Sequence, residues 1–182
     1  MRTKRLRFRR HLAVVFAALA ALGLASPAMA YSVYRAVDAD ANTGAVTWNA
    51  ANFGVSGNPT PTLSFFYFAN DAAAQAAFPT KQCFVKVDLP NTVAPAPGNQ
   101  DLVGNAGIPV GANPADQPKA FPWQIDFDNN PAGHWSIPRT QITGTTSNNA
   151  ASRVAAAGFH SLATTPASGV TIVNGTLGNC GP

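Results

Sequence analysis

The stretch 62-TLSFFYFANDAAAQAAFPTKQCFVKVDL-89 decides the fold of this chain. It contains an apolar run, an alanine-rich helix candidate and a second apolar run that carries Cys83. The segments on either side are shorter and richer in turn residues, so they need a central unit to pack against. We therefore expect residues 62–89 to supply the middle of the structure.

The two apolar runs predict strands. Leu63–Phe68 has strand length and is rich in aromatic residues, which strands favour. A continuous apolar run is typical of a strand covered on both faces, although a short buried helix gives the same pattern. In the second run alternate residues share one face, which we expect to point into the core. The residues of that face are Cys83, Val85, Val87 and Leu89.

A short helix is expected between these strands. Asn70 or Asp71 can cap it by accepting a hydrogen bond from the first turn, and Pro79 ends it. About two turns of alanine are marginal alone, so this helix must lean on the sheet. The connection is long enough for a parallel crossover, and an antiparallel arrangement is equally compatible with it.

The first thirty residues have the features of a signal peptide. Six of the twelve Lys and Arg lie within residues 2–10, and the apolar stretch Leu12–Leu24 follows them. That stretch is too short to span a bilayer comfortably, and Ala28-Met29-Ala30 fits a signal cleavage site. We expect residues 1–30 to be removed during export, leaving a mature, non-membrane-spanning chain that begins at Tyr31 in the periplasm or outside the cell.

Removal of the signal peptide reverses the net charge. Residues 31–182 keep 12 − 6 = 6 basic residues and all eight Asp, so the formal charge is 6 − 8 = −2. No basic stripe remains to neutralise phosphates, which argues against a nucleic-acid partner. The polarity comes from Asn, Thr, Ser, Gln and Gly, which suits a neutral hydrogen-bonding surface and an unknown ligand or envelope component as partner.

The cysteine content predicts one disulfide. Cys83 and Cys180 are the two cysteines, and in an exported chain their simplest arrangement is a bond to each other. A redox role would favour a close pair such as Cys-x-x-Cys, which this sequence lacks.

The flanking segments suggest further elements. Tyr31–Asp38 and Ala45–Trp48 read as an N-terminal hairpin, and residues 170–177 as a second hairpin that turns at Asn174-Gly175. Ser147 can cap a helix over Asn148–Ala157, with Gly158 near its C-terminal end. Residues 90–118 are rich in Pro and Gly and read as a long loop lying on the domain.

The clearest amphipathic strand spans Phe121–Phe127, with Asn129–Gly133 as a turn and His134–Ile137 as the returning strand. Gln141–Thr143 is a candidate extension of that returning strand. Asp126 and Asp128 share one face of the first strand. We expect any ligand site beside Trp135, His134, Asp126 and Asp128, with residues 90–118 as its lid.

A weaker candidate site is a calcium loop. Asp38, Asp40 and Asn42 place oxygen ligands at alternate positions, as the first half of an EF-hand loop does. Gly44 stands one position late for that motif, and Asn49 stands where its Glu belongs. Asx side chains that bond their own turn explain the pattern equally simply. Calcium is the one candidate cofactor that the sequence suggests; we otherwise expect none.

Residues 31–182 have the length of one domain. We expect a single α+β domain with a mainly antiparallel sheet, two short helices and one disulfide; a β-sandwich is the alternative. We expect a non-catalytic exported protein that binds a ligand or has a structural role. The alternative is a small secreted hydrolase that uses Asp126, Asp128 and His134.

Overall fold

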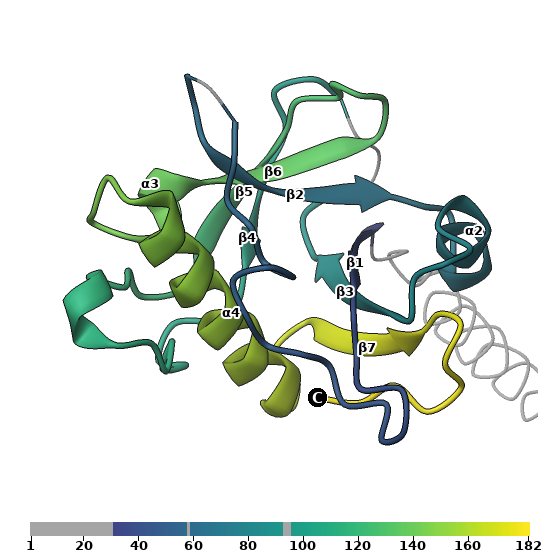
Figure 1. Cartoon of the computed structure of the whole chain (residues 1–182). Helices are drawn as coiled ribbons and strands as arrows, with labels where there is room; N and C mark the ends of the chain where they lie inside the picture. The colour runs from purple at the N-terminus through teal and green to yellow at the C-terminus, as the bar shows by residue number, and fades with distance from the viewer. Residues whose placement is uncertain (1–30, 58, 93–95) are drawn as a thin grey trace, which may run out of the picture.

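A computed structural model describes residues 31–57, 59–92 and 96–182 (Figure 1). The expected signal peptide, residues 1–30, lies outside the described residues. The elements are β1 (Tyr31–Val37), β2 (Thr62–Tyr67), α2 (Asp71–Ala77), β3 (Cys83–Leu89), β4 (Gln100–Val103), η1 (Pro114–Asp116), β5 (Trp123–Phe127), β6 (His134–Pro138), α3 (Arg139–Ile142), α4 (Asn148–Thr164) and β7 (Val170–Asn174).

The seven strands form one sheet in the order β4-β5-β6-β2-β1-β3-β7. All neighbouring strands are antiparallel, and the sheet curls into a half-barrel. The mainly antiparallel sheet and the disulfide predicted from the sequence are confirmed, and the two longer helices of the structure, α2 and α4, stand where the sequence predicted two short ones. The strands predicted for residues 63–68 and 83–89 lie on either side of β1, and both run antiparallel to it.

The concave face of the sheet holds the main core. Figure 1 shows α4 running along this face, and its apolar side chains pack against inward-pointing residues of the strands. Alternation along β3 places Cys83, Val85, Val87 and Leu89 in this core, as the sequence predicted. The fully buried aromatic rings here belong to Phe53, Phe65, Trp123, Trp135 and Phe159.

Helix α4 is longer than the sequence predicted. Ser147 caps it as expected, with its hydroxyl oxygen accepting a bond from the Ala150 N–H, but the helix continues to Thr164. Gly158 therefore lies inside the helix. A Cβ at this position would lie 2.5 Å from Cη2 of Trp123, so glycine allows α4 to approach the β5 side chains. Gly158 thus has a packing role inside α4 and does not mark the end of the helix.

Helix α2 covers part of the opposite face. Asn70 caps the helix by accepting a bond from the Ala73 N–H, and Ala74 packs with Tyr34 and Phe84 in a second, smaller cluster. The Tyr34 hydroxyl donates to Asp71 Oδ1 over 2.8 Å, which ties the start of the helix to β1. Burial and this bond raise the pKa of Tyr34 well above its ordinary value.

The pairing between strands β1 and β2 is short: Val33 is in register with Tyr67 and Tyr34 with Phe66, and the two strands then separate. Arg35 bridges the region of separation. Its Nη1 donates to the Ser64 carbonyl and its Nε to the Asn52 carbonyl, each over 2.7 Å. Burial lowers the pKa of Arg35 to about 10. The guanidinium thus holds β2 and the segment around Asn52 against β1.

The N-terminal hairpin is present only at its turn, and the C-terminal hairpin prediction is wrong. Ala39 pairs antiparallel with Val46, and the Asp40 and Thr47 N–H groups donate to the Ala45 and Asp38 carbonyls, but β1 itself pairs with β2 and β3. At the C-terminus, β7 pairs with β3, and the N–H groups of Thr176 and Leu177 donate to carbonyls of the segment before β3. Long-range pairing therefore limits the first hairpin to its turn and replaces the second hairpin altogether.

Residues 90–118 contain more structure than a loop. They supply the edge strand β4 and the short helix η1, and their apolar residues Val103 and Val110 are buried. The predicted extension at Gln141–Thr143 is also wrong, because these residues belong to α3 and its C-terminal cap. Among the described residues, no helix is long and apolar enough to cross a membrane.

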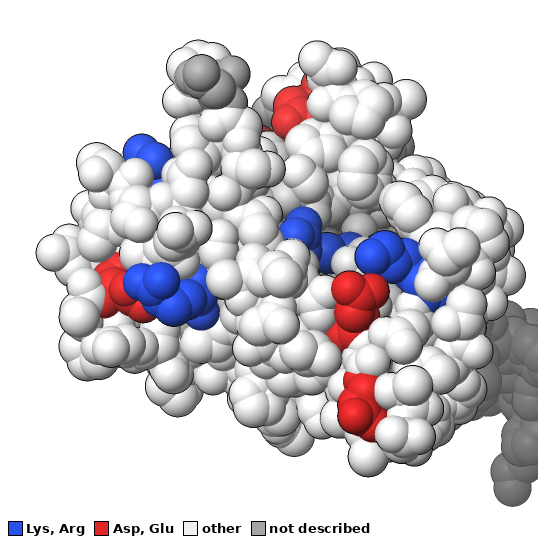
Figure 2. Space-filling model, in the orientation of Figure 1, with Lys and Arg blue, Asp and Glu red and all other residues white. Residues whose placement is uncertain are grey.

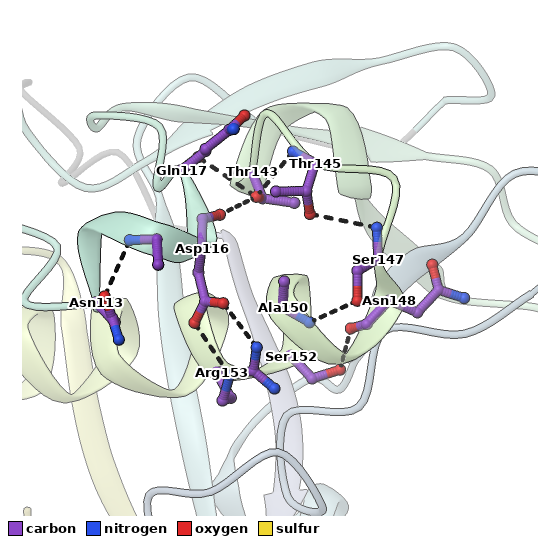
Figure 3. A network of polar contacts seen from close by, with 11 residues as sticks. Asn113, Asp116, Gln117, Thr143, Thr145, Ser147, Asn148, Ala150, Ser152 and Arg153 are labelled. Atoms are coloured by element: carbon purple, nitrogen blue, oxygen red, sulfur yellow. Dashed lines mark hydrogen bonds and ion pairs between the residues drawn. The ribbon is translucent and has the colours of Figure 1, made fainter.

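Charged side chains are sparse on the face seen in Figure 2, most of which is uncharged. One polar network joins η1 to α4 (Figure 3). Arg153 of α4 donates from Nη2 and Nε to the two carboxylate oxygens of Asp116, over 2.6 and 3.0 Å. Thr143 donates its hydroxyl to the Asp116 carbonyl, so the turn after β6 joins the same network.

Candidate functional site

A row of polar side chains crosses four strands on the convex face, opposite the main core. Gln100 of β4 is in register with Asp126 of β5, Asp126 with Ser136 of β6, and Ser136 with Ser64 of β2. Residues in register on adjacent strands place their side chains next to one another on the same face. These four residues form what we call the polar row.

Asp128 and His134 lie beside the polar row, toward the turn that joins β5 and β6. His134 Nδ1 is 2.5 Å from Asp128 Oδ1, and the Ser136 hydroxyl donates to Asp128 Oδ2 over 3.2 Å. The His134 side chain is 10% exposed, whereas that of Asp128 is 42% exposed. The carboxylate therefore orients a nearly buried imidazole and is itself open to solvent. Phe66 packs against the same imidazole with ring centroids 5.3 Å apart.

This group resembles a catalytic triad in composition but not in connection. In a triad the nucleophilic hydroxyl bonds to the imidazole, which takes up its proton. Here Ser136 donates to the carboxylate that also contacts His134. The arrangement fixes three side chains in place and leaves Ser136 bonded to the carboxylate, not to the imidazole.

Asp126 occupies the middle of the polar row. Its Oδ1 accepts a hydrogen bond from Gln124 Nε2 over 2.7 Å, and its side chain is partly exposed. Carboxylate, amide and hydroxyl groups are thus available on adjacent strands. Together they can accept and donate hydrogen bonds to a polar ligand.

The structure brings together three of the four residues expected at a ligand site. Asp126, Asp128 and His134 share the convex face, whereas Trp135 points into the core and is fully buried. The Trp135 ring packs against Phe127 and Tyr31, with centroids 5.0 and 5.7 Å away. Burial raises the pKa of Tyr31 to about 12. Trp135 therefore contributes to packing at this end of the half-barrel.

The calcium candidates make other contacts. Asp40 Oδ1 accepts bonds from the N–H groups of Asn42 and Thr43 and from the Thr43 hydroxyl. These bonds lower the pKa of Asp40. Asp38 lies 3.2 Å from Lys81 Nζ in an exposed ion pair. Within the described ranges, no three His, Cys, Asp or Glu residues gather closely enough to hold a metal ion.

The predicted disulfide is present. Cys83 and Cys180 are bonded, with Cα atoms 5.9 Å apart and a sequence separation of 97. The bond ties the C-terminal tail to the first residue of β3, a central part of the sheet.

Sequence reasoning missed Ser64 and Gln100 as members of the polar row. Ser64 is the single polar residue in an aromatic run that was interpreted as buried on both faces, and Gln100 lies in the segment interpreted as a loop. The alternation Ser64, Phe66 on one face and Leu63, Phe65 on the other was the available signal. Pairing partners across the sheet carried no sequence signal at all.

Comparison of the chain with protein-family models, with curated proteins and with solved structures gave no significant match.

Proposed function

We propose that this chain is an exported protein that binds a ligand without transforming it, and that the polar row is its binding surface. The observation that carries the proposal is the register that aligns Gln100, Asp126, Ser136 and Ser64 across four strands. Hydroxyl, amide and carboxylate groups in one row suit a neutral ligand rich in hydroxyl groups, such as a cell-wall glycan.

Export is supported by two features. The first thirty residues have a basic segment, an apolar segment and a small-residue cleavage site. The Cys83–Cys180 bond fits an oxidising compartment, the periplasm or the cell exterior, because disulfides persist there. We also propose that residues 31–182 form one α+β domain; its support is one sheet with helices on both faces around a main core.

Titration calorimetry with neutral oligosaccharides and soluble cell-wall glycan fragments tests the binding proposal. We expect measurable binding, and we expect Asp126→Ala to weaken it by about tenfold, because a hydrogen bond to a charged group contributes about 1.5–3 kcal/mol. Asp88→Ala is the matched control. Asp88 is also a carboxylate on the convex face, but it bonds to Ser32 outside the polar row.

An absence of heat with every glycan, or equal weakening by both variants, would overturn the polar row as the binding surface. A secreted hydrolase is the second candidate, and the 2.5 Å contact between Asp128 and His134 favours it. In that case the glycan fragments are cleaved on incubation, and Asp128→Ala or His134→Ala abolishes cleavage while the protein stays folded. A protein that binds without cleavage supports the first candidate.

A further inference from the structure

The two edges of the sheet differ in how they are protected. β4 forms one edge, and alternation directs the Leu102 N–H away from β5. That N–H donates to Asp101 Oδ1 over 2.8 Å, and the same carboxylate accepts bonds from Asn91 and Thr92. Because the buried carboxylate accepts the hydrogen bond from the outward-pointing Leu102 N–H, this N–H is not free to pair with another strand. Charged side chains at sheet edges commonly protect the edge from such pairing.

The other edge, β7, has no such protection. The Gly169 carbonyl and the Gly175 N–H bond to the backbone of Asp88 and Gln82. In an antiparallel pair the backbone groups of alternate residues point toward and away from the partner strand, so the groups at positions 170, 172 and 174 point away from β3. The N–H and C=O of Ile172 therefore point away from β3. Among the described residues, none bonds to these two groups. The sequence Val170–Asn174 contains no charged residue and no proline, the two residue classes that commonly block a sheet edge.

Two of the neighbouring outward-pointing backbone groups already have hydrogen-bond partners within the chain. The Val170 N–H donates to Ser168 Oγ, and the Asn174 carbonyl accepts a bond from Gln75 Nε2. The Val170 carbonyl, both groups of Ile172 and the Asn174 N–H are left along the edge. An open groove of about 520 Å³ lies beside them, between Asp71 and Gln75 of α2 and the C-terminal tail at Gly178–Cys180.

We propose that β7 pairs antiparallel with β7 of a second copy of this chain, about a two-fold axis at Ile172. The outward groups are self-complementary in that register. Each Ile172 exchanges two hydrogen bonds with its counterpart, and each Asn174 N–H meets the Val170 carbonyl of the other copy. The side chains of Val170–Asn174 are uncharged, so the two β7 strands place no like charges opposite each other.

The protected β4 edge limits the assembly to two copies. A two-fold contact uses the β7 edge of both chains, and Asp101 blocks the remaining edge of each. Sheet pairing through β7 therefore closes as a dimer and does not continue as a filament.

Sedimentation equilibrium on protein purified after expression of the full chain tests the proposal. We expect a reversible monomer–dimer equilibrium between micromolar and millimolar concentration. Ile172→Pro removes the outward N–H without removing a bond to β3, and we expect it to raise the dissociation constant about tenfold or more. Ile172→Val keeps the N–H and the branched side chain, so it is the matched control and should dimerise as the wild type does.

Hydrogen exchange of the wild-type protein provides a readout that does not depend on a variant. In a β7-paired dimer the Ile172 amide exchanges more slowly as protein concentration rises. A monomer at every concentration, polymers larger than dimers, or an Ile172 amide whose exchange is independent of concentration in a dimeric sample would overturn the proposal. A dimer as tight in Ile172→Pro as in the wild type would do the same.

Discussion

At the scale of single residues, the contact between Asp116 and Arg153 is the best-defined ion pair of the described residues. The guanidinium donates to both oxygens of a carboxylate that is almost buried (Figure 3). Two parallel hydrogen bonds between opposite charges are stronger and more directional than a single bond between neutral groups. Asp116 lies in η1 and Arg153 in α4, so this pair fastens the segment before β5 to the helix that fills the core.

This pair predicts a pH-dependent effect of Arg153→Met. The hydrogen bond from Arg153 lowers the pKa of Asp116 below its ordinary value. The stabilisation is therefore present above the ordinary carboxyl pKa, about 4, and is lost as pH falls through the lower folded-state value. We expect Arg153→Met to lower the melting temperature at neutral pH, and the difference from wild type to shrink in acid.

Arg139→Met is the control for this measurement. Arg139 donates to the Thr146 carbonyl and to Asn148 Oδ1, which do not titrate in this range. Its effect on the melting temperature, followed by circular dichroism, should stay nearly constant between neutral and acid pH. If the Arg153→Met difference stayed equally constant, the ion pair would not be the source of the stabilisation.

Single residues also show where sequence reasoning succeeds. The Cys83–Cys180 pair was predictable because a chain with two cysteines allows one intramolecular disulfide. Asp126, Asp128 and His134 were predictable as neighbours because their strands follow one another across a short turn. Arg35 and Asp101 were not, since each acts on backbone groups of segments that become neighbours only in the folded sheet.

At the scale of elements, α4 depends on a glycine inside the helix. Alanine is a better helix former than glycine by about 1 kcal/mol, so helix propensity alone favours Gly158→Ala. The new methyl group would, however, lie 2.5 Å from Trp123 and 3.1 Å from Phe121. Overpacking of this kind typically costs about 1–3 kcal/mol.

We therefore expect Gly158→Ala to lower the free energy of unfolding by about 1–2 kcal/mol, measured by urea denaturation. The double variant with Trp123→Phe is the control, because the smaller ring removes the atoms nearest to the new methyl group. In that background the penalty for Gly158→Ala should decrease or reverse. A stabilised Gly158→Ala single variant would contradict close packing of α4 on β5.

The elements that were predicted incorrectly share a physical cause. Turn residues such as Asn174-Gly175 favour local hairpins, but β7 pairs with β3, a largely buried central strand that lies far away in the sequence. Gly158 was expected near a helix C-terminus, but it lies inside α4, where the Trp123 ring packs against its Cα. Local patterns identified the strands and helices near the chain centre and failed where a distant partner decided the outcome.

At the scale of the whole molecule, the disulfide closes β3 and almost the entire chain after it into one covalent loop. We expect Cys180→Ser to lower the free energy of unfolding by up to about 4–5 kcal/mol, the value for a loop of this length in the chain-entropy model. Urea denaturation of oxidised wild type, reduced wild type and Cys180→Ser provides the comparison.

Reduced wild type is the control, since it should unfold at nearly the same urea concentration as the variant. Intact-mass measurement of exported protein should also show a chain that begins at Tyr31 with both thiols oxidised. Two free thiols, or an N-terminus that still carries its arginines, would contradict the export proposal.

The strand order has a kinetic consequence. β1 is the first described strand of the chain but sits near the middle of the sheet, where Tyr31 pairs with Leu89; further out, Leu63 pairs with Ile137 and Cys83 with Asn174. Contacts between residues so far apart in the chain give a high contact order, and proteins of this type fold in milliseconds to seconds. The sheet is incomplete until its last strand has been synthesised, so its central strands acquire their full set of neighbours only after residues 170–174 have joined the chain.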